Sequence, residues 1–247
     1  MVHYKHWCII LFYTVFFFLP TSICLSQQNS IKKQGNLFFL ANNKVDSFLE
    51  NDFLLMNARY FIVKHPRSKG KPYFEVTNNA PGKLVIDKKE YNNLRLIYDI
   101  WDQKLNLIIE KDDNKGIILE LNNQVITRFY LDDKIFVNSA ELPLFPQSGF
   151  YEEIFLGKHI NVYAKWSKHF IDNVTDGYLG EFSSPVRKLL FEINGEKVDI
   201  SSKRSYLKIF DGESKKIKSF MKKNKIHLSR ANNIDLIKLF RYTDSLL

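Results

Sequence analysis

The feature that most constrains the fold is a series of short alternating runs, separated by turn residues, through the middle of the chain. Apolar side chains alternate with polar ones over 94–100, 105–109, 117–121, 125–131 and 134–137. A period of two is typical of strands that are buried on one face. Short turns join strands to antiparallel neighbours, whereas parallel pairing needs a long crossover, so the pattern predicts an antiparallel meander sheet. The pattern leaves open whether this sheet stays open or curls into a roll or barrel.

Two predicted hairpins extend the series. The clearer one joins 189–193 to 198–200 through Asn194–Gly195. This dipeptide suits a tight primed turn because both of its residues tolerate a positive φ. The other hairpin joins 150–156 to 160–166. Both favour continued antiparallel pairing toward the C-terminal part of the chain.

Near the C-terminus the apolar spacing changes to a helical period. Ile217 and Met221 fall on one face of a predicted helix, and acidic residues stand just before it, where a helix N-terminus favours negative charge. A second amphipathic helix is predicted from Asn233. The sequence therefore predicts a mainly β, α+β fold, with a single domain over 27–247 in which a helical pair over 211–246 packs on the sheet.

Residues 1–26 have the organisation of a secretory signal peptide. A basic start is followed by an uncharged apolar run over 7–19 and a short polar segment, and Ser26 is small enough to precede a cleavage site. The prediction is therefore an exported protein, periplasmic or extracellular. Two alternatives stay open, namely acylation of Cys24 as a lipoprotein anchor and retention of the leader as an uncleaved anchor.

Both cysteines of the chain, Cys8 and Cys24, lie in this leader. The mature protein would then contain no thiol, which excludes disulfide scaffolds, thiol nucleophiles and cysteine-ligated metals. The four histidines beyond the leader form no pair at a metal-binding spacing. A nucleophile elbow and a phosphate-binding glycine-rich loop are also missing from the sequence. No cofactor and no metal is predicted.

The basicity of the chain, a formal net charge of +9, is concentrated in the first C-terminal helix. A nucleic-acid-binding surface normally favours Arg and interleaves aromatic residues, so nucleic acid is not a predicted partner. Peripheral contact with an anionic surface, such as lipid head groups or acidic glycans, is the functional interpretation, and a solvated helix face is the structural alternative. The candidate residues are all lysines: Lys215, Lys216, Lys218, Lys222, Lys223 and Lys225.

Carboxylate pairs give another hypothesis, a hydrolase that acts on a glycan or another envelope substrate. Glu152 and Glu153 are adjacent, and adjacent residues of a strand point to opposite faces, so they cannot share a site there. Asp99 and Asp102 flank a turn and are interpreted as turn and edge residues. A hydrolase would therefore need carboxylates that converge only in the folded chain.

A common layout of turns and aromatic residues runs through several segments, which are 71–74, 81–87, 91, 94–99, 105–108, 149–151, 217–226 and 235–239. This layout resembles a family of secreted Bacteroidota proteins of unknown function. The resemblance implies a Gram-negative envelope setting and brings no active site with it.

The leading functional hypothesis is a non-enzymatic module that binds an unknown envelope component or protein through its β face or exposed loops. It rests on the missing catalytic motifs together with a large scaffold of strands and aromatic residues. The hydrolase and a membrane-surface protein that uses the lysine-rich helix are the alternatives.

Overall fold

The computed structural model describes residues 58–75, 81–109, 116–174 and 177–247. These residues belong to one unit, Asp52–Leu247. The predicted leader and its cysteines lie outside the described residues. Among the helices that are described, none is long and apolar enough to cross a membrane.

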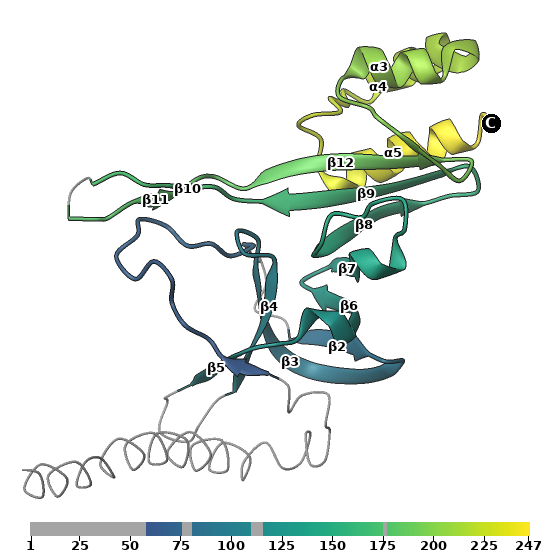
Figure 1. Ribbon diagram of the computed structural model, residues 1–247. Helices are drawn as coiled ribbons and strands as arrows, with labels where there is room; N and C mark the ends of the chain where they lie inside the picture. Colours follow the sequence, from purple (N-terminus) through teal and green to yellow (C-terminus); the bar gives the residue numbers. More distant parts are fainter. Residues whose placement is uncertain (1–57, 76–80, 110–115, 175–176) are drawn as a thin grey trace, which may run out of the picture. The chain divides into compact units, whose positions relative to one another are not determined.

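Eleven strands form one sheet with the order β1-β5-β4-β3-β2-β6-β7-β8-β9-β12-β13, and every pairing is antiparallel. The predicted antiparallel meander is therefore confirmed, and the sheet is not closed into a barrel (Figure 1). Short β10 (Phe170–Ile171) and β11 (Glu181–Phe182) pair separately. The eleven strands are β1 (Arg59–Tyr60), β2 (Gly82–Ile86), β3 (Lys89–Asp99), β4 (Lys104–Ile109), β5 (Ile117–Glu120), β6 (Ile126–Leu131), β7 (Lys134–Asn138), β8 (Phe150–Leu156), β9 (Ile160–Ser167), β12 (Val186–Ile193) and β13 (Glu196–Val198).

Two tight turns fix the register of their hairpins. Asn194 and Gly195 have φ values of 52° and 81°, so the predicted primed turn between β12 and β13 is confirmed. Asp87 and Lys88, with φ values of 45° and 67°, make a similar turn between β2 and β3. β2 is not among the predicted strands, because its turn into β3 contains no glycine.

Aromatic side chains from strands far apart in the sheet meet in its interior. Tyr98 of β3 lies 5.8 Å from Phe150 of β8, measured between ring centroids, although β2, β6 and β7 stand between these strands in the sheet order. Phe129 and Phe136, on β6 and β7, stack at 4.7 Å and complete the cluster. The sheet therefore bends over this aromatic core without closing.

Three helices follow the sheet, where two had been predicted. They are α3 (Lys203–Ile209), α4 (Ser214–Lys223) and α5 (Asn233–Asp244), so α4 and α5 correspond to the predicted pair. The additional helix α3 begins at a capping box in which Ser202 and Ser205 exchange side-chain and backbone hydrogen bonds. In Figure 1, α5 lies along the sheet, where it contacts β8, and α3 and α4 lie beyond α5.

A second core joins the helices to one face of the sheet. Ile217 and Met221 of α4 and Phe240 of α5 are buried together with Val162 of β9 and Phe191 of β12. The predicted apolar face of α4 is therefore the face that packs inward. This packing leaves the opposite face of α4 exposed to solvent.

The carboxylate of Asp244, at the end of α5, ties this helix to the turn between β8 and β9. It accepts the backbone N–H groups of Lys158, His159 and Ile160 at 2.7 to 3.0 Å. Desolvation raises the pKa of Asp244, but these hydrogen bonds outweigh it and hold the pKa below its ordinary value. A carboxyl group of this kind stabilises the fold above its unfolded pKa and loses that contribution as the pH falls through the lower folded pKa.

Replacing Asp244 by Asn is expected to lower the free energy of unfolding by about 1 kcal/mol at pH 7, since the group is only half-buried and solvent screens it. The loss should shrink toward acid pH, where the wild-type carboxylate becomes protonated. Urea unfolding between pH 3 and 7 measures both effects. Asp199→Asn, at an exposed position, is the matched control, and equal effects of the two variants would contradict the assignment.

Candidate functional site

The six predicted lysines lie on the exposed side of α4 and just after it. Lys215, Lys216, Lys218, Lys222, Lys223 and Lys225 are all exposed, whereas Ile217 and Met221 between them are buried. Of the six, Lys216 pairs with Glu213 at 2.8 Å. The other five make no ion pair with any residue that the structure describes. Their charge is therefore directed at solvent.

Helix α3 enlarges this positive surface, which the sequence analysis had confined to α4. α3 contacts α4, and its Lys203, Arg204 and Lys208 are exposed. Residues 203–247 contain twelve Lys and Arg against four Asp and Glu, so this part of the chain carries nearly the whole net charge of +9. We call the exposed basic residues of α3 and α4, together with Lys225, the basic helical layer.

A small cavity lies at another place, where loop 61–73 meets the turn between β3 and β4. Its walls come from residues 61–65, Pro72 and Tyr73 of the loop, the β3–β4 turn around Trp101, and Phe182 of β11. Its volume is about 40 Å³, which is room for a few water molecules or one small group. We call it the Trp101 cavity.

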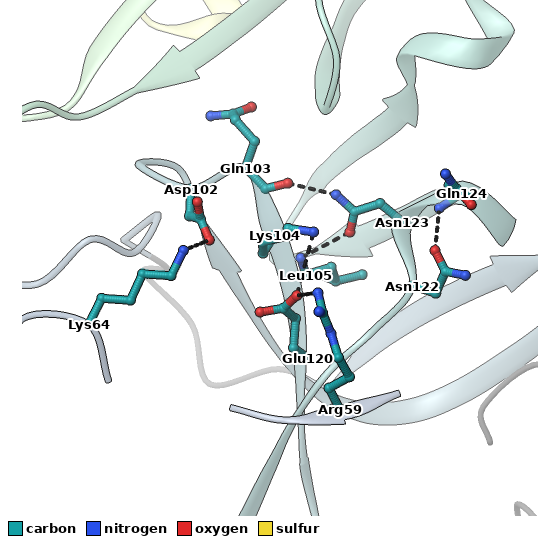
Figure 2. Close-up of polar contacts among 10 residues, drawn as sticks. All are labelled: Arg59, Lys64, Asp102, Gln103, Lys104, Leu105, Glu120, Asn122, Asn123 and Gln124. Carbon is teal, nitrogen blue, oxygen red and sulfur yellow. Dashed lines mark hydrogen bonds and ion pairs between the residues drawn. The ribbon is translucent and has the colours of Figure 1, made fainter. Parts of the chain in front are cut away.

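Three carboxylates line the Trp101 cavity, and two of them belong to ion pairs that are drawn in Figure 2. Lys64 Nζ lies 2.5 Å from Asp102 Oδ2 and 5.4 Å from the centre of the Trp101 ring. On the neighbouring strands, Glu120 Oε1 lies 2.8 Å from Arg59 Nη2 and 3.5 Å from Lys104 Nζ. Basic groups therefore neutralise two of the carboxylates at the cavity.

A third carboxylate, Asp99, lies in the floor of the turn. Its Oδ1 accepts the backbone N–H groups of Trp101 and Asp102 at 2.9 and 2.8 Å. The prediction that Asp99 is a turn residue is therefore confirmed. Burial raises the pKa of Asp99, and its two backbone hydrogen bonds and Lys64 oppose that rise.

The loop from 64 to 72 is partly packed. The ring of His65 stacks on Phe170 at a centroid distance of 3.7 Å, and the backbone of Lys69 pairs with that of Gly180 and Phe182. Phe170 and Phe182, which contact His65, lie more than a hundred positions away in the sequence, and Trp101 contacts the same ring from the β3–β4 turn. No local pattern therefore indicates the cavity, because it forms from separate segments.

The remaining predicted carboxylates separate as expected for a strand. Glu152 is fully buried and accepts hydrogen bonds from Trp166 Nε1 and Asn233 Nδ2, both at 2.6 Å. Glu153 is half-buried, and the charge of Arg128 opposes the rise in pKa that burial causes. Both carboxylates of Glu152 and Glu153 have a raised pKa because of burial. Glu152 is therefore placed inside a buried polar network and not at a surface where a substrate docks.

No group of His, Cys, Asp and Glu suited to hold a metal occurs within the described ranges. Comparison of the chain with protein-family models, with curated proteins and with solved structures gives no match. The basic helical layer and the Trp101 cavity are thus the two features from which function is argued.

Proposed function

We propose that this chain is an exported, non-enzymatic binding protein that contacts an anionic surface of the cell envelope through its basic helical layer. The observation that carries the proposal is the row of exposed lysines on α4 that have no ionic partner among the described residues. The predicted leader supports export, and the charge of the layer supports phosphate-bearing lipid head groups as the ligand.

Electrostatic attraction, without insertion, is the mode of binding that this layer supports. The apolar residues of α4, Ile217 and Met221, are buried under the helix and hold it to the rest of the protein. Ile209 is the one large apolar side chain classed as exposed on α3 and α4, both of which are fully described. One such side chain buries too little area to anchor a helix in lipid. Binding should therefore weaken steeply with salt.

The hydrolase alternative has less support, because the carboxylates are already engaged by other groups of the protein. Glu152 is engaged inside the protein, and Asp99 Oδ1 holds the backbone of its own turn. Asp102 and Glu120 each have a basic partner at 2.5 to 2.8 Å. A general acid and base need a free pair of carboxyl groups beside a space for the substrate.

The test is sedimentation with vesicles of phosphatidylglycerol and phosphatidylcholine at low salt. The wild-type protein should bind vesicles in proportion to their phosphatidylglycerol content, and 0.5 M salt should release it. The triple variant Lys215→Gln, Lys218→Gln and Lys222→Gln should bind at least tenfold more weakly, because each lysine near an anionic surface contributes about 1 kcal/mol.

A matched triple variant, Lys69→Gln, Lys71→Gln and Lys88→Gln, removes the same charge from exposed positions outside the layer. It should bind within about twofold of the wild type if the layer is the site. Equal weakening of both triple variants would mean that net charge alone drives association. Salt-insensitive binding by the wild type would also overturn the proposal.

A further inference from the structure

The Trp101 cavity combines an aromatic wall with acidic groups. The aromatic residues Trp101, Tyr73, Phe61 and Phe182 line the cavity. Trp101 and Phe182 also contact each other edge to face at 5.8 Å, so this part of the wall is fixed. Aromatic faces attract cations through the ring quadrupole, and the indole face is the strongest of them. The wall alone therefore favours a positively charged guest.

The carboxylates of the cavity point to the same kind of guest. Asp102 and Glu120 are at its edge, and Asp99, 4% exposed, is at its floor. The backbone of the turn uses Asp99 Oδ1, and no hydrogen bond of the described residues reaches Asp99 Oδ2. Carboxylates around the cavity favour a cationic guest over an anionic one.

Lys64 shows which cation fits. Its ammonium group already sits between the Asp102 carboxylate and the Trp101 ring. The side chain of Lys64 is 52% exposed, whereas that of Asp102 is 29% exposed. Because exposed ion pairs contribute little to stability, Lys64 is free to leave, and Asp102 stays in the turn that the backbone fixes. Lys64 thus holds its own primary ammonium group at the place where an ammonium group from another molecule would bind.

We infer that the Trp101 cavity is a binding site for a primary alkylammonium group, which takes the place of the Lys64 ammonium between Asp102 and Trp101. The cavity, with a volume of about 40 Å³, has room for a small group such as an ammonium head. Such a group is carried by a lysine side chain of a partner protein or by a free polyamine. This inference is independent of the basic helical layer and of its proposed function.

The test uses Lys64→Met, which keeps the length of the side chain and removes the competing charge. Wild-type and variant protein are titrated with butylammonium chloride, and the indole N–H resonance of Trp101, assigned with Trp101→Phe, reports binding. Lys64→Met should bind butylammonium about fivefold more tightly than the wild type, since the weak internal competitor is gone. Adding Asp102→Asn to Lys64→Met should reverse this gain.

Butanol, which has a similar size and no charge, is the matched control and should leave the Trp101 resonance unchanged. Equal affinities of wild type and Lys64→Met, or an equal response to butanol, would overturn the inference. Lys64→Gln repeats the test if the Met variant unfolds. Titration with 1,5-diaminopentane and with N-acetyl-lysine methylamide separates the two sources: tighter binding of either identifies the ligand class, and binding of neither refutes it.

Discussion

Replacing Glu152 by Ala is expected to lower the free energy of unfolding by about 2–5 kcal/mol, because each buried donor left without an acceptor costs about 1–3 kcal/mol. Glu152 of β8 is completely buried and receives hydrogen bonds from Trp166 of β9 and from Asn233, the first residue of α5. The variant leaves both of these donors without an acceptor. It also removes a negative charge that acts on a half-buried cation nearby.

That cation is Arg187 of β12. Arg187 donates to Asn233 Oδ1 at 3.1 Å and to the carbonyl of Ala231 at 2.5 Å, and its guanidinium lies over the Trp166 ring. Burial lowers the pKa of Arg187, and the charge of Glu152 opposes this effect. The network therefore connects three neighbouring strands to the beginning of α5, and its loss should loosen the helices as well as the sheet.

Urea unfolding followed by circular dichroism measures the effect of Glu152→Ala. Glu152→Gln, which keeps an acceptor for Trp166, should lose less than the Ala variant. Glu153→Ala, one position along and on the opposite face, should cost about 1 kcal/mol or less. In the double variant of Glu152→Ala with Arg187→Met, the losses should be smaller than the sum of the single ones. Strict additivity would show that Glu152 and Arg187 do not interact.

The sheet could be predicted because its information is local. Alternating apolar residues over each run, and the Asn194–Gly195 turn, determine both the pairing and its direction. Among the elements that escaped prediction, β2 and α3 did so for reasons that are also local. β2 enters its hairpin through Asp87–Lys88, which lacks the usual glycine, and α3 has only seven residues, so its periodicity is weak.

The two candidate sites also differ in whether their residues are close together in the sequence. The lysines of α4 are close in sequence, so helical periodicity alone places them on one exposed face. The Trp101 cavity joins loop 61–73, the β3–β4 turn, Glu120 and Phe182, and nothing in the sequence links these segments. Bending of the sheet over Tyr98 and its neighbours is likewise a property of the folded chain.

Lys165 of β9 shows most clearly what periodicity does not reveal. It occupies a strand position at which a lysine is expected to face solvent, yet it is 6% exposed. Its Nζ donates to the carbonyl of Ser148 at 2.8 Å and lies 4.5 Å from the centre of the Tyr151 ring. Desolvation lowers the pKa of Lys165 to about 8. The loop that contains Ser148 covers the lysine, and this contact is long-range.

The stability of the protein should therefore rise with pH between about 8 and the ordinary lysine value of 10.5. In this interval the folded state has released the Lys165 proton and the unfolded state still holds it, so the free energy of unfolding increases by up to about 3 kcal/mol. Other groups titrate in the same range, and Lys165→Met isolates the effect.

The difference in unfolding free energy between wild type and Lys165→Met, measured in urea from pH 7 to 10, should shift in favour of the wild type as the pH rises. Lys188→Met, at the exposed position paired with Lys165 on β12, should show no such shift. A difference that stays constant across this range would mean that Lys165 keeps its ordinary pKa, with its ammonium adequately solvated beneath the loop.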